Sequence, residues 1–239
     1  MQFKFWNRGR SGGYEAEEEK VQHFMGSLVM WRTIIQHFLP MILITQIGAW
    51  SDKHGRKLPM LMVIITFICR YIFLLLAVNN GMSAWNVGIV SAAISSLAGN
   101  NACFGMAAFS YVSDTTPPDK LTQRTSITGS AFFVGITFGM LLGGFFSAQH
   151  FGYTQIFSIG LTTEVVVLFS IVAFVRDVRT DENATLHEML VDLLSSKHFK
   201  DSFKSVLKPR TGNTRLKLLL LLFAHSLTLA PMYGKLTLY

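Results

Sequence analysis

The sequence predicts an all-α membrane protein with several membrane-spanning helices, and three observations support that prediction. Apolar residues make up 50% of the 239 residues and charged residues only 15%, whereas soluble domains carry about 25% charged residues. Several apolar windows approach the length of about 20 residues that crosses a bilayer. The charged residues gather between these windows. A soluble helical protein is the alternative, but its helices should each show one polar face.

The apolar windows place five complete spans along the chain. Residues 1–23 are polar and rich in glutamate, and they predict a flexible lead-in. The stretches "NNGMS", "SDTTPPDKLTQRTS" and "SAQHFGYTQ" are typical of turns and loops, because they concentrate Gly, Pro, Asn, Asp and Ser. Together these signals define a five-span bundle over residues 24–175, with spans predicted at 24–50, 58–78, 85–111, 127–146 and 156–175.

A long charged segment, residues 176–217, follows the fifth span. Leu186, Leu190 and Leu193 recur at helical spacing, and this pattern predicts a cytoplasmic loop with amphipathic helices that lie on the membrane surface. Residues 218–239 contain "LLLLLFAHSLTLA" and predict the start of the next span.

The connections between the spans differ sharply in positive charge. Connections 51–57, 113–126 and 176–217 carry three, two and nine Lys and Arg residues, whereas 79–84 and 147–155 carry none. Lys and Arg favour the cytoplasmic side, so the three basic connections are predicted inside. The net charge of +7 then indicates contact with anionic membrane lipid, and no nucleic-acid partner is expected.

The same rule predicts that the segment before Phe24 lies on the side of the membrane opposite the cytoplasm. Its basic residues resist translocation, so we expect a further span upstream of it and interpret the sequence as part of a longer protein. Multi-pass insertion in the plasma membrane or an endolysosomal membrane is the expected localisation.

A dense charged turn separates the first two predicted spans. Its residues follow the spacing Gly48-x-x-x-Asp52-Lys53-x-Gly55-Arg56-Lys57. Glycine near a helix end lets a neighbouring helix approach closely, and a second glycine permits a tight turn. Arginine can bind terminal carbonyls, phosphates or a carboxylate. A generic basic cytoplasmic turn is the alternative interpretation.

This spacing resembles the signature between the second and third helices of each half in the major facilitator superfamily. The stretches "VMWRTIIQHFLPMILITQIGAWSDKHGRKLPML", "FSYVSDTTPPDKLTQRTS" and "LAPMYGKLTLY" resemble proton-coupled folate transporter-like solute carriers, particularly those of arthropods. The resemblance implies a partial chain that supplies family helices two to six and the start of helix seven, without the first helix and most of the C-terminal half. It also implies that the six turn residues form a conformational latch against the other half.

Ionisable and polar residues inside the predicted spans are costly and need an explanation. Arg32 lies near the outer interface, where it either snorkels or contacts an anionic substrate, and Gln36 and His37 are candidates for lining a cavity. Arg70 is expected to pair with an acid or a carbonyl. Glu164 lies in mid-span and is a candidate proton carrier, a structural partner of an arginine, or part of a polar site.

Two further groups lie within spans. Asn100 and Asn101 either bond across helices or face substrate, and the sequence does not separate these roles. Glycines recur four apart in the fourth span and predict a surface for close helix packing; these are Gly135, Gly139, Gly143 and the adjacent Gly144. Proton-coupled relatives carry a carboxylate in a stretch that matches residues 128–130, and this chain has none there.

These observations favour transmembrane transport of a small organic solute by alternating access, with an organic anion such as a folate-like compound as one candidate. We expect the chain alone to be inactive. The alternative is a non-transporting regulatory partner of a full-length transporter. No enzyme, metal site or cofactor is predicted, because the sequence shows no nucleophile–base pairing, metal cluster or phosphate cradle. Coupling to protons is left open.

Overall fold

The computed structural model describes residues 12–176, 191–193, 217, 220, 223 and 224. Its contacts divide the chain into two units, one of residues 1–34 with 209–239 and one of residues 35–208. Within the described part of the first unit, α1 runs through residues 12–34. The second unit holds the remainder of α1 and all of the other helices in the described residues.

The helices follow the predicted order, and no strand occurs among the described residues. The described residues hold six labelled α-helices: α1 (Gly12–His54), α2 (Lys57–Asn79), α3 (Ala84–Ser96), α4 (Asn100–Thr115), α5 (Leu121–Ala148) and α6 (Tyr153–Phe174). Within this part of the chain, five stretches are long and apolar enough to cross a membrane, and α3 with α4 counts as one of them. The prediction of an all-α membrane protein is therefore confirmed.

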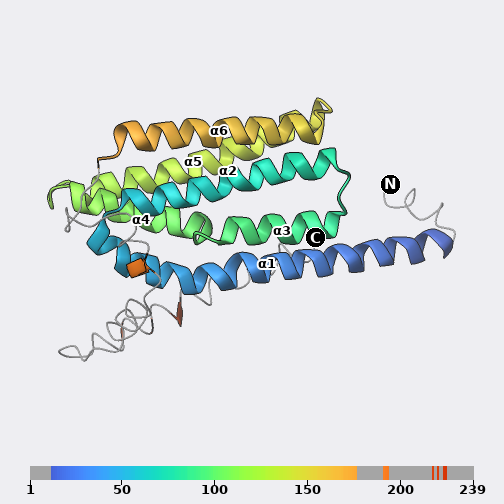
Figure 1. Cartoon of the computed structure of the whole chain (residues 1–239), viewed down its shortest axis with the longest axis horizontal. Helices are drawn as coiled ribbons and strands as arrows, with labels where there is room; N and C mark the ends of the chain where they lie inside the picture. The colour runs from blue at the N-terminus through green and yellow to red at the C-terminus, as the bar shows by residue number, and fades with distance from the viewer. Residues whose placement is uncertain (1–11, 177–190, 194–216, 218–219, 221–222, 225–239) are drawn as a thin grey trace, which may run out of the picture. The chain divides into compact units, whose positions relative to one another are not determined.

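The central helix of the second unit is α2, which packs against α3, α4 and α6 (Figure 1). Pro59, Met60, Val63, Ile64 and Phe67 of α2 are buried, and their spacing places them along one side of the helix. Ile47 and Trp50 of α1, Cys103 and Ala107 of α4, and Ile171 of α6 complete the buried core. This core lies at the end of α2 that carries the charged turn, so it fixes the helix ends around that turn.

Helix α1 begins earlier than predicted. The polar lead-in was expected to be flexible up to residue 23, but residues 12–23 are helical. Glutamate and alanine are strong helix formers, and acidic residues near an N-terminus interact favourably with the helix dipole. The sequence "YEAEE" has this composition, so local propensity extends the helix beyond the apolar window.

The third predicted span, 85–111, is broken rather than continuous. Residues 97–99 separate α3 from α4, and both Gly99 (φ 82°) and Asn100 (φ 58°) adopt left-handed backbone conformations. Glycine adopts this conformation without steric cost, and asparagine does so more readily than most residues. The Asn100 side-chain oxygen also accepts a hydrogen bond from the backbone N–H of Asn101 at 2.8 Å. These two residues therefore divide one membrane-length segment into two helices.

Helix α5 contributes no residue to the core. Its packing contacts are with α4, and its apolar side chains are exposed, including Phe133 and Met140. A Cβ placed on each of its four candidate packing glycines would meet no atom within 4 Å in the described part of the chain; these are Gly135, Gly139, Gly143 and Gly144. The close helix contact predicted for this stripe is therefore not made within the described residues.

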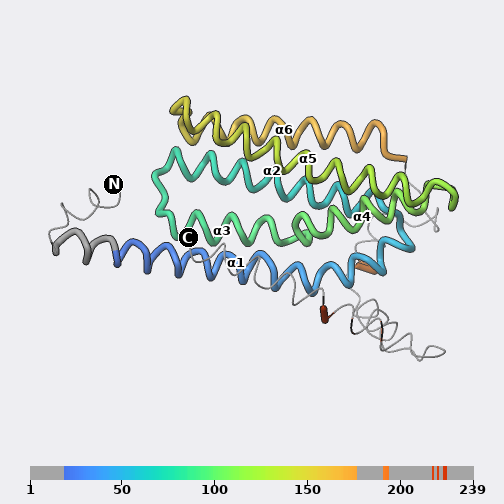
Figure 2. Tube along the Cα trace, turned by 180° about the vertical axis from the view of Figure 1, so that it is seen from behind, coloured from blue at the N-terminus to red at the C-terminus, as the bar shows by residue number. Residues whose placement is uncertain are grey.

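The predictions for the C-terminal third lie mostly outside the described residues. The three residues 191–193 are helical, whereas the remaining expected amphipathic segment over 177–217 and the span over 218–239 are described at only four further positions. Three connections, at residues 80–83, 116–120 and 149–152, fall within the polar stretches of the sequence. Figure 2 shows the path of the backbone from the opposite side.

Candidate functional site

The charged turn joins α1 to α2 through two residues. Gly55 has φ 98°, and its backbone N–H donates to the carbonyl of Ser51 at 3.0 Å. A left-handed glycine after the last helical residue is a common way to end a helix, because it redirects the chain and satisfies terminal carbonyls. Lys53 and His54 occupy the last turn of α1, where positive charge complements the helix dipole.

Arg56 is the centre of a charged network that also contains Ser51, Asp52 and Asp114, here called the Arg56 network. Its guanidinium donates from Nη2 to Asp52 Oδ1 at 2.5 Å and from Nε to Asp114 Oδ2 at 2.9 Å. Nη1 also donates to the Ser51 hydroxyl at 2.6 Å. Ser51 and Asp52 belong to α1 and Asp114 to α4, so one side chain joins the ends of three helices.

The burial of this network is uneven. The Arg56 side chain is 12% exposed, whereas the side chains of Asp52 and Asp114 are 66% and 40% exposed. Burial alone would lower the pKa of Arg56, but the hydrogen bonds and charges of Asp114 and Asp52 raise it above the ordinary value. The guanidinium therefore stays charged, and its two anionic partners remain accessible to water. Such an arrangement holds the helix ends together and can be opened.

Other residues of the predicted motif contact further elements around the turn. A Cβ on Gly48 would lie 3.2 Å from Met106 Sδ, so α1 passes close to α4 at that position. Lys57 Nζ donates to the carbonyl of Val172 at 2.9 Å, near the end of α6. Lys53 Nζ lies 3.6 Å from Asp192 Oδ2. The sequence did not indicate Asp114 or Asp192 as partners; the only available signal was that Asp114 is an acid at the end of a predicted span.

Replacing Lys57 by methionine is expected to lower the free energy of unfolding by about 1 kcal/mol, because one terminal carbonyl of α6 loses its cationic donor. Thermal unfolding in detergent would then begin about 2–4 °C lower. Lys120 is an exposed lysine, so Lys120→Met provides the matched control and should leave the transition unchanged. Equal shifts in both variants would show that charge alone, and not the bond to Val172, sets the stability.

Within the spans, the structure brings Arg70 of α2 and Glu164 of α6 close enough for a coulombic interaction. The Arg70 guanidinium lies over the ring of Tyr71, 4.6 Å from its centroid, and its buried Nε has no hydrogen-bond partner among the described residues. The Tyr71 ring in turn lies against Gly160, one turn before Glu164. These contacts place Arg70 and Glu164 in one neighbourhood, and the three roles considered for Glu164 stay predictions.

The remaining candidate residues are not gathered into one cavity within the described part of the chain. His37 is exposed and Gln36 is half-buried in the second unit, and Arg32 is exposed in the first. Asn100 begins α4 and Asn101 is exposed. That these residues contact a solute remains a prediction.

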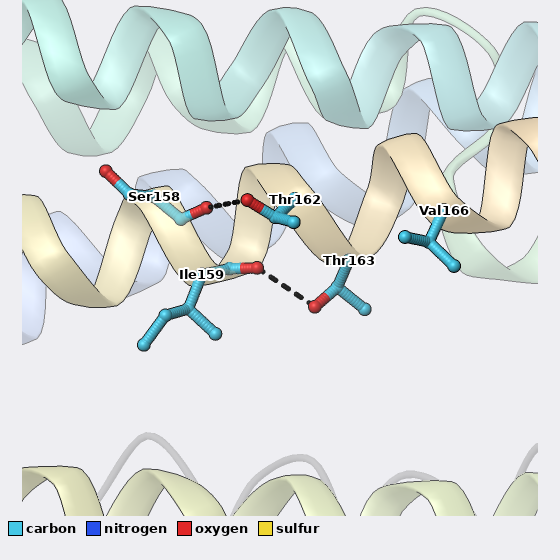
Figure 3. Close-up of a pocket in the computed structure, with 5 residues that line it drawn as sticks. All are labelled: Ser158, Ile159, Thr162, Thr163 and Val166. Carbon is cyan, nitrogen blue, oxygen red and sulfur yellow. Dashed lines mark hydrogen bonds between the residues drawn. The ribbon is translucent and has the colours of Figure 1, made fainter.

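An open groove of about 400 Å³ runs along α6 and is lined by Ser158, Ile159, Thr162, Thr163 and Val166. The hydroxyls of Thr162 and Thr163 donate to the carbonyls of Ser158 and Ile159, one turn earlier in the same helix (Figure 3). The donors of both threonines are therefore already used, and the groove presents a mainly apolar surface. None of the residues predicted from the sequence lines it.

Comparison with known proteins identifies the family. The family model described as Major Facilitator Superfamily matches residues 20–239. A tetracycline resistance protein, class H, from Pasteurella multocida is 28% identical over 131 residues, which cover 55% of this chain and 30% of that relative. The match thus spans about a third of the relative's length. The chain is an integral multi-pass membrane protein, and it belongs to the Major Facilitator Superfamily.

Proposed function

We propose that this chain is the latch-bearing helix bundle of a transporter that moves a small organic solute by alternating access. The observation that supports the proposal is the Arg56 network, in which one mostly buried guanidinium joins the ends of α1, α2 and α4. Its carboxylate partners are exposed, so the contacts can exchange for water or for a partner surface at modest cost. A reversible connection of this kind suits a protein that alternates between two conformations.

Alternating access generally works between two helix bundles, with the solute near the membrane midplane between them. The five candidate spans described here would supply one such bundle. We therefore propose that flux needs a second bundle, whether it belongs to the same polypeptide or to another one. On this proposal, the 239-residue chain reconstituted alone in liposomes shows no flux above that of empty liposomes.

The proposed solute class is an organic anion such as a folate-like compound. The sequence resemblance supports this class, and so do the two arginines within the spans, Arg32 and Arg70. The relative from Pasteurella multocida is named for tetracycline resistance, so tetracycline is the second compound that the proposal requires to be tested.

The test is to delete the gene in its own cells and to measure uptake of labelled folate, tetracycline and a neutral sugar. We expect deletion to change movement of the organic anion, and we expect the native chain but not Arg56→Gln to restore it. Fractionation of plasma and endolysosomal membranes locates the activity. Unchanged movement of every compound after deletion would contradict the proposal. A change that depends on a co-purifying full-length transporter would instead assign the chain a regulatory role.

A further inference from the structure

The helical segment of residues 191–193 docks on the end of α1 that carries the charged turn (Figures 1 and 2). Asp192 Oδ2 lies 2.8 Å from His54 Nε2, and Gln46 Nε2 donates to the carbonyl of Leu193. The Leu193 side chain packs against the buried core. Both polar contacts join residues more than a hundred positions apart in sequence, so they hold a distant segment in place beside the Arg56 network.

His54 is buried, so its hydrogen bond to Asp192 is important for holding its side chain. Its side chain is 2% exposed, and its ring lies 5.4 Å from that of Trp50 between centroids. Nδ1 is buried and has no hydrogen-bond partner among the described residues. Nε2 is therefore the ring nitrogen through which His54 is held. Protonation strengthens the bond from Nε2 to Asp192, and it adds an N–H at Nδ1 that has no partner among the described residues.

Among the described residues, Asp192 is the carboxylate that lies at hydrogen-bond distance from His54. On α1, Asp52 pairs with Arg56, and Lys53 Nζ lies 3.6 Å from the same oxygen of Asp192. The guanidinium of Arg56 is bound to Asp52 and to Asp114 of α4. Lys57 of α2 donates to a carbonyl of α6. A proton on His54 thus meets a carboxylate at hydrogen-bond distance.

We propose that His54 and Asp192 form a proton-controlled clasp, which fastens residues 191–193 to the end of α1. A protonated imidazole donates a charge-assisted hydrogen bond, which is about twice as strong as a neutral one. Histidine is the side chain whose charge most readily changes near neutral pH. Docking is therefore expected to tighten when His54 is protonated and to loosen when it is neutral.

The clasp would give the latch a sensor of proton concentration. His54 lies two residues before Arg56 and next to Lys53, so release of segment 191–193 frees the turn that holds the Arg56 network. This consequence for transport rests on the proposed function. The docking itself does not, because it is measured without any solute.

The experiment places a spin label on Val191→Cys of the full chain in nanodiscs and records the spectrum at pH 5.5 and pH 8.0. Val191 is 56% exposed and reports the mobility of the segment. The native chain, labelled in the same way, supplies the signal of exposed Cys69 for subtraction. We expect the ratio of immobilised to mobile label to be about fivefold higher at pH 5.5, because a charged hydrogen bond exceeds a neutral one by about 1 kcal/mol.

Variants assign the response to the clasp. His54→Gln keeps a donor without a titrating group and should abolish the pH response, and Asp192→Asn should lower the ratio at pH 5.5. His23→Gln removes an exposed histidine of the same helix and should leave the response intact. The joint substitution of His187 and His198 by glutamine, which removes the histidines near Asp192 in sequence, should also leave it intact.

Several results would overturn the clasp. One is an equal ratio at both pH values in the native chain, and another is a response that survives His54→Gln. Loss of the pH response on replacing His187 and His198 would show that these histidines, and not His54, cause it. Helical circular dichroism shows whether His54→Gln folds. If it does not, Asp192→Asn still tests the clasp: an unchanged ratio of immobilised to mobile label at pH 5.5 would refute the contact between His54 and Asp192. A failed uptake experiment with an intact spin-label response would refute the transport proposal alone.

Discussion

Arg56→Gln is expected to lower the free energy of unfolding by about 2 kcal/mol and the midpoint of thermal unfolding by about 4–8 °C. The substitution removes the charged donor shared by Asp52 and Asp114 and leaves both carboxylates without its positive charge. This loss is smaller than for a fully buried ion pair, because both acids are substantially exposed and water screens them. Thermal unfolding of the purified chain in detergent provides the measurement.

Two control variants isolate the geometry of this site. Arg56→Lys retains the charge but cannot place separate donors on two carboxylates as a planar guanidinium does, so it should recover less than half of the loss. Arg124 is an exposed arginine near the start of α5, and Arg124→Gln should leave the midpoint in place. Full rescue by lysine would show that only the net charge of the turn matters.

Gly99→Ala is expected to cost about 2–4 kcal/mol, the sum of backbone strain and overpacking. The backbone at Gly99 has φ 82°, where any Cβ is disfavoured. An added Cβ would also lie 2.7 Å from Cys103 Cβ and 3.4 Å from Ile44 Cγ1. Since Cys103 Cβ is fixed to the backbone of α4, it cannot move aside as the end of a flexible side chain could.

The matched control is Gly105→Ala, in the same helix. A Cβ on Gly105 meets nothing within 4 Å in the described part of the chain, and alanine favours a helix by about 1 kcal/mol over glycine. This variant should therefore be as stable as the native chain or slightly more stable, as measured by thermal unfolding. A Gly99→Ala variant with native stability would contradict the broken third span, because a continuous helix would accept alanine.

The positions of the spans could be predicted because membrane insertion depends on local apolar length. The predicted span at 58–78 and α2 at Lys57–Asn79 differ by one residue at each end. The break at 97–99 could not be predicted in the same way, since Gly99 and Asn100 are equally compatible with helix packing. The helical start at Gly12 was missed because it follows local propensity and not the apolar pattern.

For each contact of the candidate site, the sequence predicted the residue on the charged turn but not the residue that it binds. The spacing from Gly48 to Lys57 indicated a functional turn, and its residues lie where the helices meet. The partners Asp114 and Asp192 are 58 and 138 residues from Arg56 and His54. Such pairs depend on how helices pack, and a single sequence carries no signal for that arrangement. Likewise, Arg70 and Glu164 lie near each other because α2 packs against α6, and the sequence alone could not predict this packing.

A double-mutant cycle between Arg56 and Asp114 tests the central claim most directly, that one guanidinium joins the ends of these helices. The stabilities of the native chain, Arg56→Gln, Asp114→Asn and the double variant give the coupling energy. We predict a coupling of about 1–2 kcal/mol, since the two side chains share a charged hydrogen bond. Additive losses, with a coupling below about 0.5 kcal/mol, would contradict the account.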